Sequence, residues 1–148
     1  MLDAVAVRVR RLDLTLPLPE YAYSGDAGLD LRSAVDRVLK PQERALIPTG
    51  IKIAIPKGYA GFVQPRSGLA ARQGLSLVNT PGLIDSQYRG EIVVIAINLD
   101  AAEPIDIHKG DRIAQLVILP IPQVTLVEVD ELDGTERSEQ GFGSSGSA

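Results

Sequence analysis

The segment 82–92 combines an acid and an aromatic side chain in a stretch bracketed by turn residues. The short polar side chains of Asp85 and Ser86 favour a tight reversal, because they bond to the nearby backbone. The segment therefore predicts a β-hairpin with the Asp85 carboxylate at its tip. This carboxylate can accept a proton from water, and the ring of Tyr88 can stack on a flat ligand. The alternative is that Asp85 only forms the turn and that Tyr88 is only half-buried.

A second segment with possible chemistry, 65–74, reads Pro-Arg-Ser-Gly-Leu-Ala-Ala-Arg-Gln-Gly. Ser67 suits the N-cap of a helix, good helix formers follow it, and Gly74 suits the C′ position. The sequence therefore predicts a helix of about two turns. The free N–H groups of its first turn can hold a phosphate, with Arg66 beside them and no side chain at Gly68. The alternative is an ordinary helical connection between strands.

Two further polar residues lie within predicted strands. Alternation in the run Ala-Gly-Leu-Asp-Leu directs Leu29 and Leu31 to the core and leaves Asp30 on the opposite face. Asp30 can orient the waters of a hard cation such as Mg²⁺, or it can be an ordinary exposed strand acid. Gln115 lies in the apolar run 112–119 and needs hydrogen-bond partners. It either satisfies backbone groups, which is the simpler interpretation, or reaches into a site.

The last residues of the chain differ in character from the rest. Between Glu128 and Glu139 there are six acids and one cation, Arg137, and Gly-Phe-Gly-Ser-Ser-Gly follows. This composition is typical of a frayed terminal tail. Phe142 can nevertheless stack on a flat ligand, Arg137 can pair with a phosphate, and the glycine-serine backbone can surround anionic oxygens. The segment is not a Walker sequence, because the required lysine is absent.

Composition limits the chemistry that the chain can perform. Its 148 residues, 45% of them hydrophobic, fit one folded domain with a real core. The chain has no cysteine and a single histidine, which excludes thiol nucleophiles, disulfides, zinc clusters and two-histidine metal sites within one chain. Carboxylate, hydroxyl and arginine chemistry remain.

Charge and hydropathy restrict the partners. The net charge of −4 argues against stable nucleic-acid binding, although most of the cations are arginine, which grips phosphate well. No apolar run is long enough to span a membrane, and no segment has the pattern of a signal peptide. We therefore expect a cytoplasmic protein with no membrane partner.

Short strand-like segments recur along the chain. Many short strands at close spacing predict an all-β fold, a sandwich or jelly roll, with one short helix. The run 92–97 is apolar on both faces, so we expect another subunit to cover one of them and the protein to be a trimer. The predicted strands are 5–9, 27–31, 45–47, 51–55, 59–63, 92–97, 105–107 and 112–119.

Five segments together resemble, in the right order, the five motifs of the trimeric deoxyuridine triphosphate nucleotidohydrolases, the dUTPases. The resemblance covers nearly the whole chain and implies a jelly-roll-like β-sandwich or barrel, the dUTPase-like β-clip. It further implies a homotrimer with C-terminal arm exchange and active sites assembled from all three chains. The domain 1–136 would then carry a flexible arm, 137–148, that completes the site. The motif segments are 27–31, 65–70, 82–91, 110–116, and Arg137 with 141–146.

The resemblance also implies an activity and roles for individual residues. The activity is hydrolysis of dUTP to dUMP and pyrophosphate with Mg²⁺, which keeps uracil out of DNA and supplies dUMP for thymidylate synthesis. Asp85 would activate the water that attacks the α-phosphorus, and Asp30 would hold the hydration shell of a Mg²⁺ bound mainly by the triphosphate. Tyr88 would pack against the deoxyribose and exclude a 2′-hydroxyl. The remaining residues would be Arg66, Ser67, Gly68 and Gln115 for the triphosphate, Asn79, Gly82 and Ile84 for uracil, Arg137 for the γ-phosphate, Phe142 over the base, and Gly143 and Ser144 beside it.

One segment departs from the family pattern. Members commonly have glycines soon after the motif-five arginine, whereas this chain has Ser-Glu-Gln at 138–140. The arm is therefore stiffer and more acidic, and Glu139 would repel a triphosphate unless it points to solvent.

Two other functions fit the same scaffold. A dCTP deaminase, or a bifunctional deaminase and dUTPase, places a glutamate in the strand after the hairpin, and Glu91 lies too near the turn for that role. The second is a non-catalytic nucleotide-binding regulator. Such a protein would not explain why the chain combines a proton acceptor, Asp85, with the aromatic Tyr88 and the phosphate-binding candidates Arg66 and Gln115.

Overall fold

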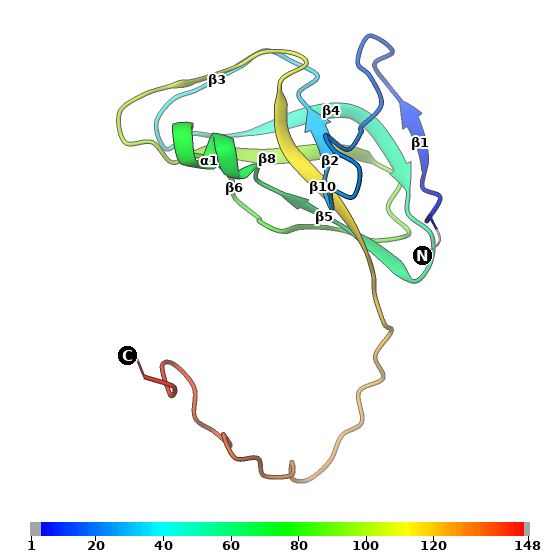
Figure 1. Cartoon of the computed structure of the whole chain (residues 1–148), viewed down its shortest axis with the longest axis vertical. Coiled ribbons are helices and arrows are strands. Elements are labelled where there is room, and N and C mark those ends of the chain that lie inside the picture. The colour runs from blue at the N-terminus through cyan, green and yellow to red at the C-terminus, as the bar shows by residue number, and fades with distance from the viewer. Residues whose placement is uncertain (1–3, 147–148) are drawn as a thin grey trace.

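The computed structural model describes residues 4–146 and consists of two four-stranded antiparallel sheets, one two-stranded sheet and one helix (Figure 1). The first sheet has the order β1 (Arg8–Arg11), β4 (Arg44–Ala54), β8 (Glu91–Asn98), β6 (Leu75–Leu77). The second has the order β2 (Leu29–Arg32), β10 (Arg112–Pro120), β5 (Tyr59–Gln64), β7 (Gly82–Ile84). The small sheet pairs β3 (Arg37–Leu39) with β9 (Ile105–Ile107), and the helix is α1 (Ser67–Gln73). The predicted all-β fold with one short helix is confirmed.

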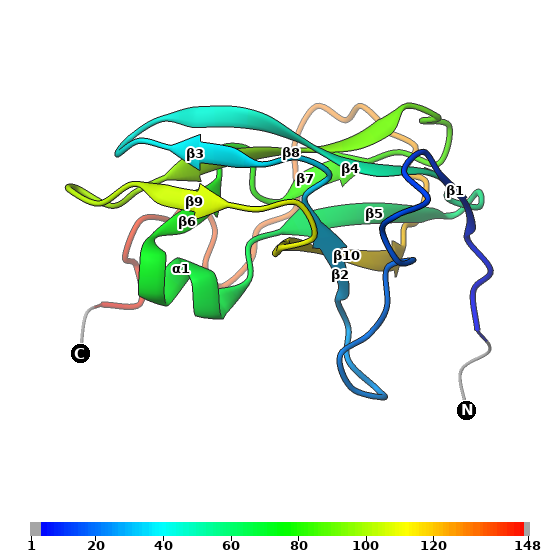
Figure 2. The ribbon, with the colours of Figure 1, turned by 90° about the horizontal axis from the view of Figure 1, so that it is seen from above.

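The core lies between the two large sheets. In Figure 2, β4 and β8 lie on one side of it and β5 and β10 on the other. Period-two alternation directs Ile92, Val94 and Ala96 of β8 into this core, where they meet apolar side chains of the second sheet. The outer face of the first sheet is also apolar, and Leu46 on it is 69% exposed.

The two strands predicted at 45–47 and 51–55 are one strand, β4, and the prediction of a break was wrong. The register of β4 against β8 shifts between Pro48 and Lys52, which marks a β-bulge. Gly50 lies in the bulge with φ 73°, and its N–H donates to the Glu91 carboxylate at 3.0 Å. The proline and the glycine therefore bend the strand without ending it.

The N-terminal strand is shorter and more exposed than predicted. The alternation at 5–9 predicts a half-buried strand, but β1 begins at Arg8 and all four of its residues are exposed. β1 pairs only with β4, so it is an edge strand whose other side has no partner within the described residues. Exposed arginines at an edge are a common protection against unwanted strand pairing.

The segment 82–92 is not the predicted hairpin. β7 pairs with β5 in the second sheet, and β8 pairs with β4 and β6 in the first. The turn residues at 85–90 therefore connect the two sheets at one end of the sandwich. Turn chemistry in the sequence indicates that the chain reverses, but it does not specify which strands become neighbours.

Helix α1 has the predicted length, but its N-terminus is shifted by one residue. Arg66 is the N-cap residue, and it makes no side-chain cap hydrogen bond. Ser67, the predicted cap, is the first helical residue. Gly74 ends the helix in the left-handed region, at φ 72°, as predicted. No helix among residues 4–146 has the length and apolar character needed to cross a membrane.

The chain leaves the sandwich after Ile121, whose N–H donates to the carbonyl of Gly58 at 2.8 Å. Residues 122–146 form no strand, and all of them are exposed, including the aromatic ring of Phe142. Figure 1 shows this segment extending away from the sheets. It contains residues 137–146 of the predicted arm and also the preceding residues 122–136, whereas residues 147–148 of the predicted arm lie outside the described residues.

Asn98 is fully buried at the end of β8 and connects three parts of the fold. Its Nδ2 donates to the carbonyls of Leu39 at 3.0 Å and Glu103 at 2.9 Å, and its Oδ1 accepts the N–H of Asp100 at 2.8 Å. The sequence analysis did not identify this residue, because a lone asparagine after an apolar run looks like a turn former.

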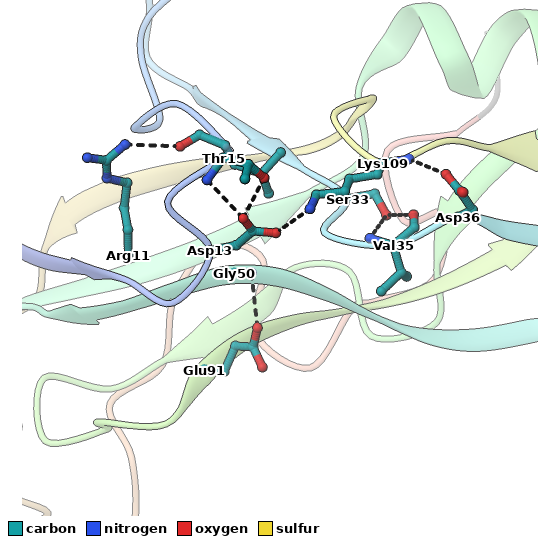
Figure 3. Close-up of polar contacts among 10 residues, drawn as sticks. Arg11, Asp13, Thr15, Ser33, Val35, Asp36, Gly50, Glu91 and Lys109 are labelled. Carbon is teal, nitrogen blue, oxygen red and sulfur yellow. Dashed lines mark hydrogen bonds and ion pairs between the residues drawn. The ribbon is translucent and has the colours of Figure 1, made fainter.

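A polar network also fastens the connection after β1 to the turn before β10 (Figure 3). The Asp13 carboxylate lies 2.7 Å from the Lys109 ammonium and accepts the backbone N–H of Thr15 at 2.9 Å and its hydroxyl. The backbone N–H of Lys109 donates to Asp36 at 2.8 Å. The bond from Lys109 and the bonds from Thr15 lower the pKa of Asp13 from 3.8 to about 2.

We expect Asn98→Ala to lower the free energy of unfolding by at least about 2 kcal/mol, because buried groups left without a partner cost about 1–3 kcal/mol each. Urea denaturation measures this change. Asn79→Ala is the matched control, because Asn79 is the other asparagine of the chain and is exposed. Equal small effects of both substitutions would contradict a structural role for the Asn98 bonds.

We expect Asp13→Asn to lower Tm near neutral pH, and the difference from wild type to disappear as pH falls from 3.8 through about 2. A carboxylate whose folded pKa lies below its unfolded pKa stabilises the fold above the unfolded value, and this stabilisation is lost as the folded form is protonated. Melting curves at a series of pH values measure it. Asp106→Asn, at an exposed position of β9, serves as control. A difference independent of pH would contradict the ion pair.

Candidate functional site

A cavity of about 460 Å³ lies beside α1, and we call it the helix cavity. It collects residues from three segments that are distant in the sequence. Five of its lining residues are among those that the sequence analysis assigns to phosphate or metal, and this part of the expected site is therefore formed within one chain. These five residues are Asp30, Arg66, Ser67, Gly68 and Gln115.

Asp30 is the buried acid of the helix cavity. Its Oδ1 lies 3.1 Å from Nε of Arg66, and its Oδ2 lies 3.7 Å from Nε of Arg112. Asp30 is only 9% exposed, so the alternative of an exposed strand acid was wrong. A buried carboxylate needs such compensation, and in return it fixes the direction of the Arg66 side chain.

Arg112 is a site residue that the sequence analysis did not identify. It begins β10, and its Cα partner in β2 is Arg32, with a register shift between Arg112 and Ala114. The shift brings Arg112 to Asp30, and strand alternation alone does not reveal such a bulge. Its carbonyl also accepts a hydrogen bond from Nη1 of Arg66 at 3.3 Å.

Gln115 both satisfies the backbone and lines the helix cavity. Its Nε2 donates to the carbonyl of Pro65 at 2.9 Å, which fixes the residue before the N-cap of α1. Its Oε1 lies against Gly28, where a Cβ would collide with it. The glycine in the motif Ala-Gly-Leu-Asp-Leu is therefore needed for this close approach rather than for a turn.

The donors in the helix cavity suit a hard cation that is held mainly by other ligands. Two carboxylates, Asp26 and Asp30, line it, and oxygen donors are those that Mg²⁺ prefers. The described residues contain no group of three or more histidine, cysteine or acidic residues that would hold a metal ion by themselves. The chain therefore fits an ion bound through water and through substrate oxygens.

A smaller pocket of about 170 Å³ lies beside the connection between β7 and β8, and we call it the loop pocket. Apolar walls come from residues such as Val63 and Leu77. Four predicted site residues line it: Asn79, Gly82, Ile84 and Tyr88. The Tyr88 hydroxyl donates to the carbonyl of Glu91 at 2.9 Å, and its ring lies against Gly90, where a Cβ would collide with it.

Asp85 is exposed at the start of the connection between β7 and β8 and faces a wide cleft of about 910 Å³. Its carbonyl accepts the N–H of Tyr88 at 3.1 Å, which forms the turn. Its carboxylate makes no hydrogen bond or ion pair with other residues of the range 4–146. The Asp85 carboxylate takes no part in the turn, so it is available for another role.

Arg89 holds the shape of this connection, and the sequence analysis did not identify it. Its Nη1 donates to the carbonyl of Ser86 at 2.7 Å and to that of Tyr88 at 2.9 Å. The two carbonyls flank the turn that carries Asp85, so one guanidinium fixes both. The only sequence signal was an arginine close to turn residues.

The helix cavity and the loop pocket have no lining residue in common. Figures 1 and 2 place α1 and the connection between β7 and β8 at opposite ends of the sandwich. One chain therefore does not bring Asp85 together with Arg66 and Gln115. The four predicted arm residues line none of these hollows, and Nε of Arg137 donates to the carbonyl of Gln140 at 2.7 Å within the arm. These residues are Arg137, Phe142, Gly143 and Ser144.

Residues 15–146 match the family model described as dUTPase. The chain is 56% identical to a deoxyuridine 5′-triphosphate nucleotidohydrolase of Corynebacterium glutamicum, over 99% of this chain and 98% of that protein. It is 58% identical to that of Thermobifida fusca, over 96% of this chain and 79% of the relative.

Solved structures agree with this match. The dUTPase of Staphylococcus bacteriophage 80alpha with dUPNHPP has a TM-score of 0.89 and 35% identity, over 96% of this chain and 99% of that one. A mutant dUTPase of phage phi11 of S. aureus, solved to describe coordination of a structural Mg(II) ion, has a TM-score of 0.80 and 32% identity, over 87% and 99%. The resemblance found in the five motifs is confirmed, and the chain belongs to the dUTPase family.

Proposed function

We propose that the chain hydrolyses dUTP to dUMP and pyrophosphate at sites formed between three copies of itself. One observation carries the proposal: the residues suited to phosphate and those suited to a pyrimidine nucleoside lie in two separate hollows at opposite ends of one chain. Each hollow is half of a site for a nucleoside triphosphate. In a cyclic trimer, the helix cavity of one copy meets the loop pocket of the next, and each pair forms one complete site.

The exposed apolar surface supports association. Leu46 on the outer face of the first sheet is 69% exposed, Leu83 on β7 of the second sheet is 60% exposed, and Val78 after β6 is 47% exposed. On the outer face of the first sheet, Leu46 of β4 and Val93 of β8 are both exposed, and an apolar outer sheet face is typical of a surface that another protein covers.

In this arrangement the loop pocket binds uracil and deoxyribose. Asn79 and backbone groups at Gly82 and Ile84 hydrogen-bond the edge of the base, and Tyr88 packs against the sugar. The Tyr88 hydroxyl donates to the carbonyl of Glu91, so moving the ring aside for a 2′-hydroxyl would break this hydrogen bond. A group that does not fit the pocket, such as this hydroxyl, raises the free energy of binding relative to the correct substrate by about 1–3 kcal/mol or more.

The helix cavity takes the phosphates. Arg66, fixed by Asp30, donates to phosphate oxygens together with the hydroxyl of Ser67, the backbone at Gly68 and the amide of Gln115. Asp26 and Asp30 would hold the hydration shell of a Mg²⁺ bound mainly by the triphosphate, and such an ion would offset part of the triphosphate charge.

Asp85 accepts the proton of the attacking water. Its carboxylate makes no hydrogen bond or ion pair with other residues of the range 4–146. The two hydrogen bonds from Arg89 to the carbonyls of Ser86 and Tyr88 hold the loop that carries it. The water oxygen bonds to the α-phosphorus, the bond from that phosphorus to the bridging oxygen breaks, and pyrophosphate leaves with the electron pair. Placement of the base and the water in one geometry supplies much of the rate gain.

The C-terminal arm completes the site of a neighbouring copy. Arg137 binds the γ-phosphate, Phe142 covers the base, and Gly143 and Ser144 close over the nucleotide. The full exposure of Phe142 in the free chain supports this role, because an aromatic ring gains most from such a covering contact.

A deaminase is not favoured by the geometry at Glu91. Its carboxylate binds the N–H of Gly50 at the bulge of β4, which is a structural task. Supplying dUTP or dCTP with Mg²⁺ and measuring pyrophosphate and ammonia distinguishes the activities. We expect pyrophosphate from dUTP and no ammonia from dCTP.

We expect Asp85→Asn to keep the fold and the binding of a non-hydrolysable dUTP analogue, and to lower kcat by about 10²-fold or more, because it removes the proton acceptor and keeps the shape. Steady-state kinetics and calorimetry measure the two effects. Asp106→Asn makes the same change at an exposed position of β9 and should leave kcat unaltered. A variant at Asp85 with nearly normal kcat would reduce this residue to a turn former.

We expect two inactive variants to restore activity when they are co-expressed. One is Asp85→Asn, and the other is the chain truncated after Glu136. In random mixed trimers, sites with an intact loop from one copy and an intact arm from another would give on the order of a quarter of wild-type activity.

The control replaces the truncated partner by a truncated chain that also carries Asp85→Asn, which should restore nothing. Light scattering should give a trimer mass in every case. A monomer mass, or no restored activity in trimers of mixed composition, would exclude a site shared in this way.

A further inference from the structure

The side chain of Arg72 lies over the first turn of α1. Its Nη1 and Nη2 atoms are 3.0 and 3.3 Å from the point that a Cβ on Gly68 would occupy. Residues four apart share one face of a helix, and long side chains lean towards the N-terminus. The glycine at 68 therefore provides the room in which the guanidinium lies, at the edge of the helix cavity.

Local electrostatics do not explain this position. A cation is stabilised near the C-terminal end of a helix, whereas this guanidinium points towards the N-terminal turn with its free N–H groups. Among residues 4–146 it forms no ion pair and no hydrogen bond. The nearest buried acid of the cavity, Asp30, is already paired with Arg66 and Arg112.

Arg72 changes the net charge of the helix cavity and therefore its attraction for an anionic ligand. The ionised side chains that line it are Arg66 and Arg72 against Asp26 and Asp30, so the lining carries no net charge. Arg112 lies 3.7 Å from Asp30 and adds one more cation beside the lining. With it, the cluster has one net positive charge, and that charge is lost without Arg72. Arg66 does not replace Arg72, because its charge is shared with Asp30 at 3.1 Å.

We propose that Arg72 is a further substrate-binding residue, whose guanidinium binds the β- and γ-phosphates, the part of dUTP that leaves as pyrophosphate. This inference rests on the proposed function. When the bond between the α-phosphorus and the bridging oxygen breaks, its electron pair adds negative charge to the leaving pyrophosphate. Arg72 binds that growing charge, while the proton of the attacking water goes to Asp85 at the far side of the α-phosphate.

The test compares Arg72→Gln and Arg72→Lys with wild type as full-length proteins at fixed Mg²⁺. We expect Arg72→Gln to lower kcat/KM for dUTP and to weaken inhibition by pyrophosphate, each by about 10- to 100-fold, since a lost charge-assisted bond has this size. Inhibition by dUMP, which lacks the two outer phosphates, should change less than about twofold. Arg72→Lys should restore part of the loss, because it keeps the charge but not the planar fork.

Lys40→Gln is the control, because it removes one exposed cation far from the lining residues of the helix cavity. It should leave all three quantities unchanged. Pyrophosphate and dUMP inhibition that fall equally in Arg72→Gln, or that both stay normal, would overturn the inference. Melting temperatures show whether Arg72→Gln is misfolded. If it is, Arg72→Lys becomes the test: a Lys variant whose inhibition by pyrophosphate is not weakened more than its inhibition by dUMP also overturns the inference. A wild-type protein that does not hydrolyse dUTP refutes the proposed function instead.

Discussion

The buried Asp30 carboxylate is the constraint on which the arrangement of the helix cavity depends. It lies on β2, and its partners Arg66 and Arg112 belong to the N-cap of α1 and to the start of β10. A carboxylate at 9% exposure must be compensated, so these three segments are held at fixed distances. Gln115 adds a second tie through the carbonyl of Pro65. These bonds form the cavity before any ligand enters, so the proposed binding of phosphate would require little reorganisation of the protein.

The sequence predicted the fold class and most of the local elements well. It predicted poorly which strands pair and which distant side chains make contact. Apolar runs located β8 and β10, alternation located β9, and Gly74 located the end of α1 correctly. It placed a hairpin where β7 and β8 join different sheets, because local turn propensity carries no information about distant pairing. It also missed Arg112, whose contact with Asp30 depends on a bulge. Asn98 was missed for a similar reason, since one of its three bonds reaches Leu39, 59 residues away in the sequence.

The candidate site was predictable only as a set of residues. The five motifs identified them through the resemblance, and the fold distributes them over two hollows and an extended arm. The resemblance implied a site shared between copies of the chain, but no local residue pattern indicated which residues would lie in which hollow. Local geometry nevertheless explains several motif positions in physical terms: Gly28 admits Gln115, Gly90 admits the Tyr88 ring, and Gly68 admits Arg72. At Gly28 and Gly90 a side-chain atom lies too close for a Cβ, and at Gly68 the Arg72 guanidinium would have to shift slightly to admit one.

The extended segment after Ile121 sets the reach of the arm in the proposed trimer. Its first fifteen or so residues can span up to about 50 Å when extended, which is enough to cross one subunit. Because the arm stays covalently attached, Arg137 and Phe142 are present near a neighbouring site at an effective concentration that is typically millimolar for a short flexible linker. Site closure is then an event within one assembly and does not depend on the concentration of the protein. Lengthening the segment 122–136 would dilute the arm at its target, and shortening it below the required span would prevent contact altogether.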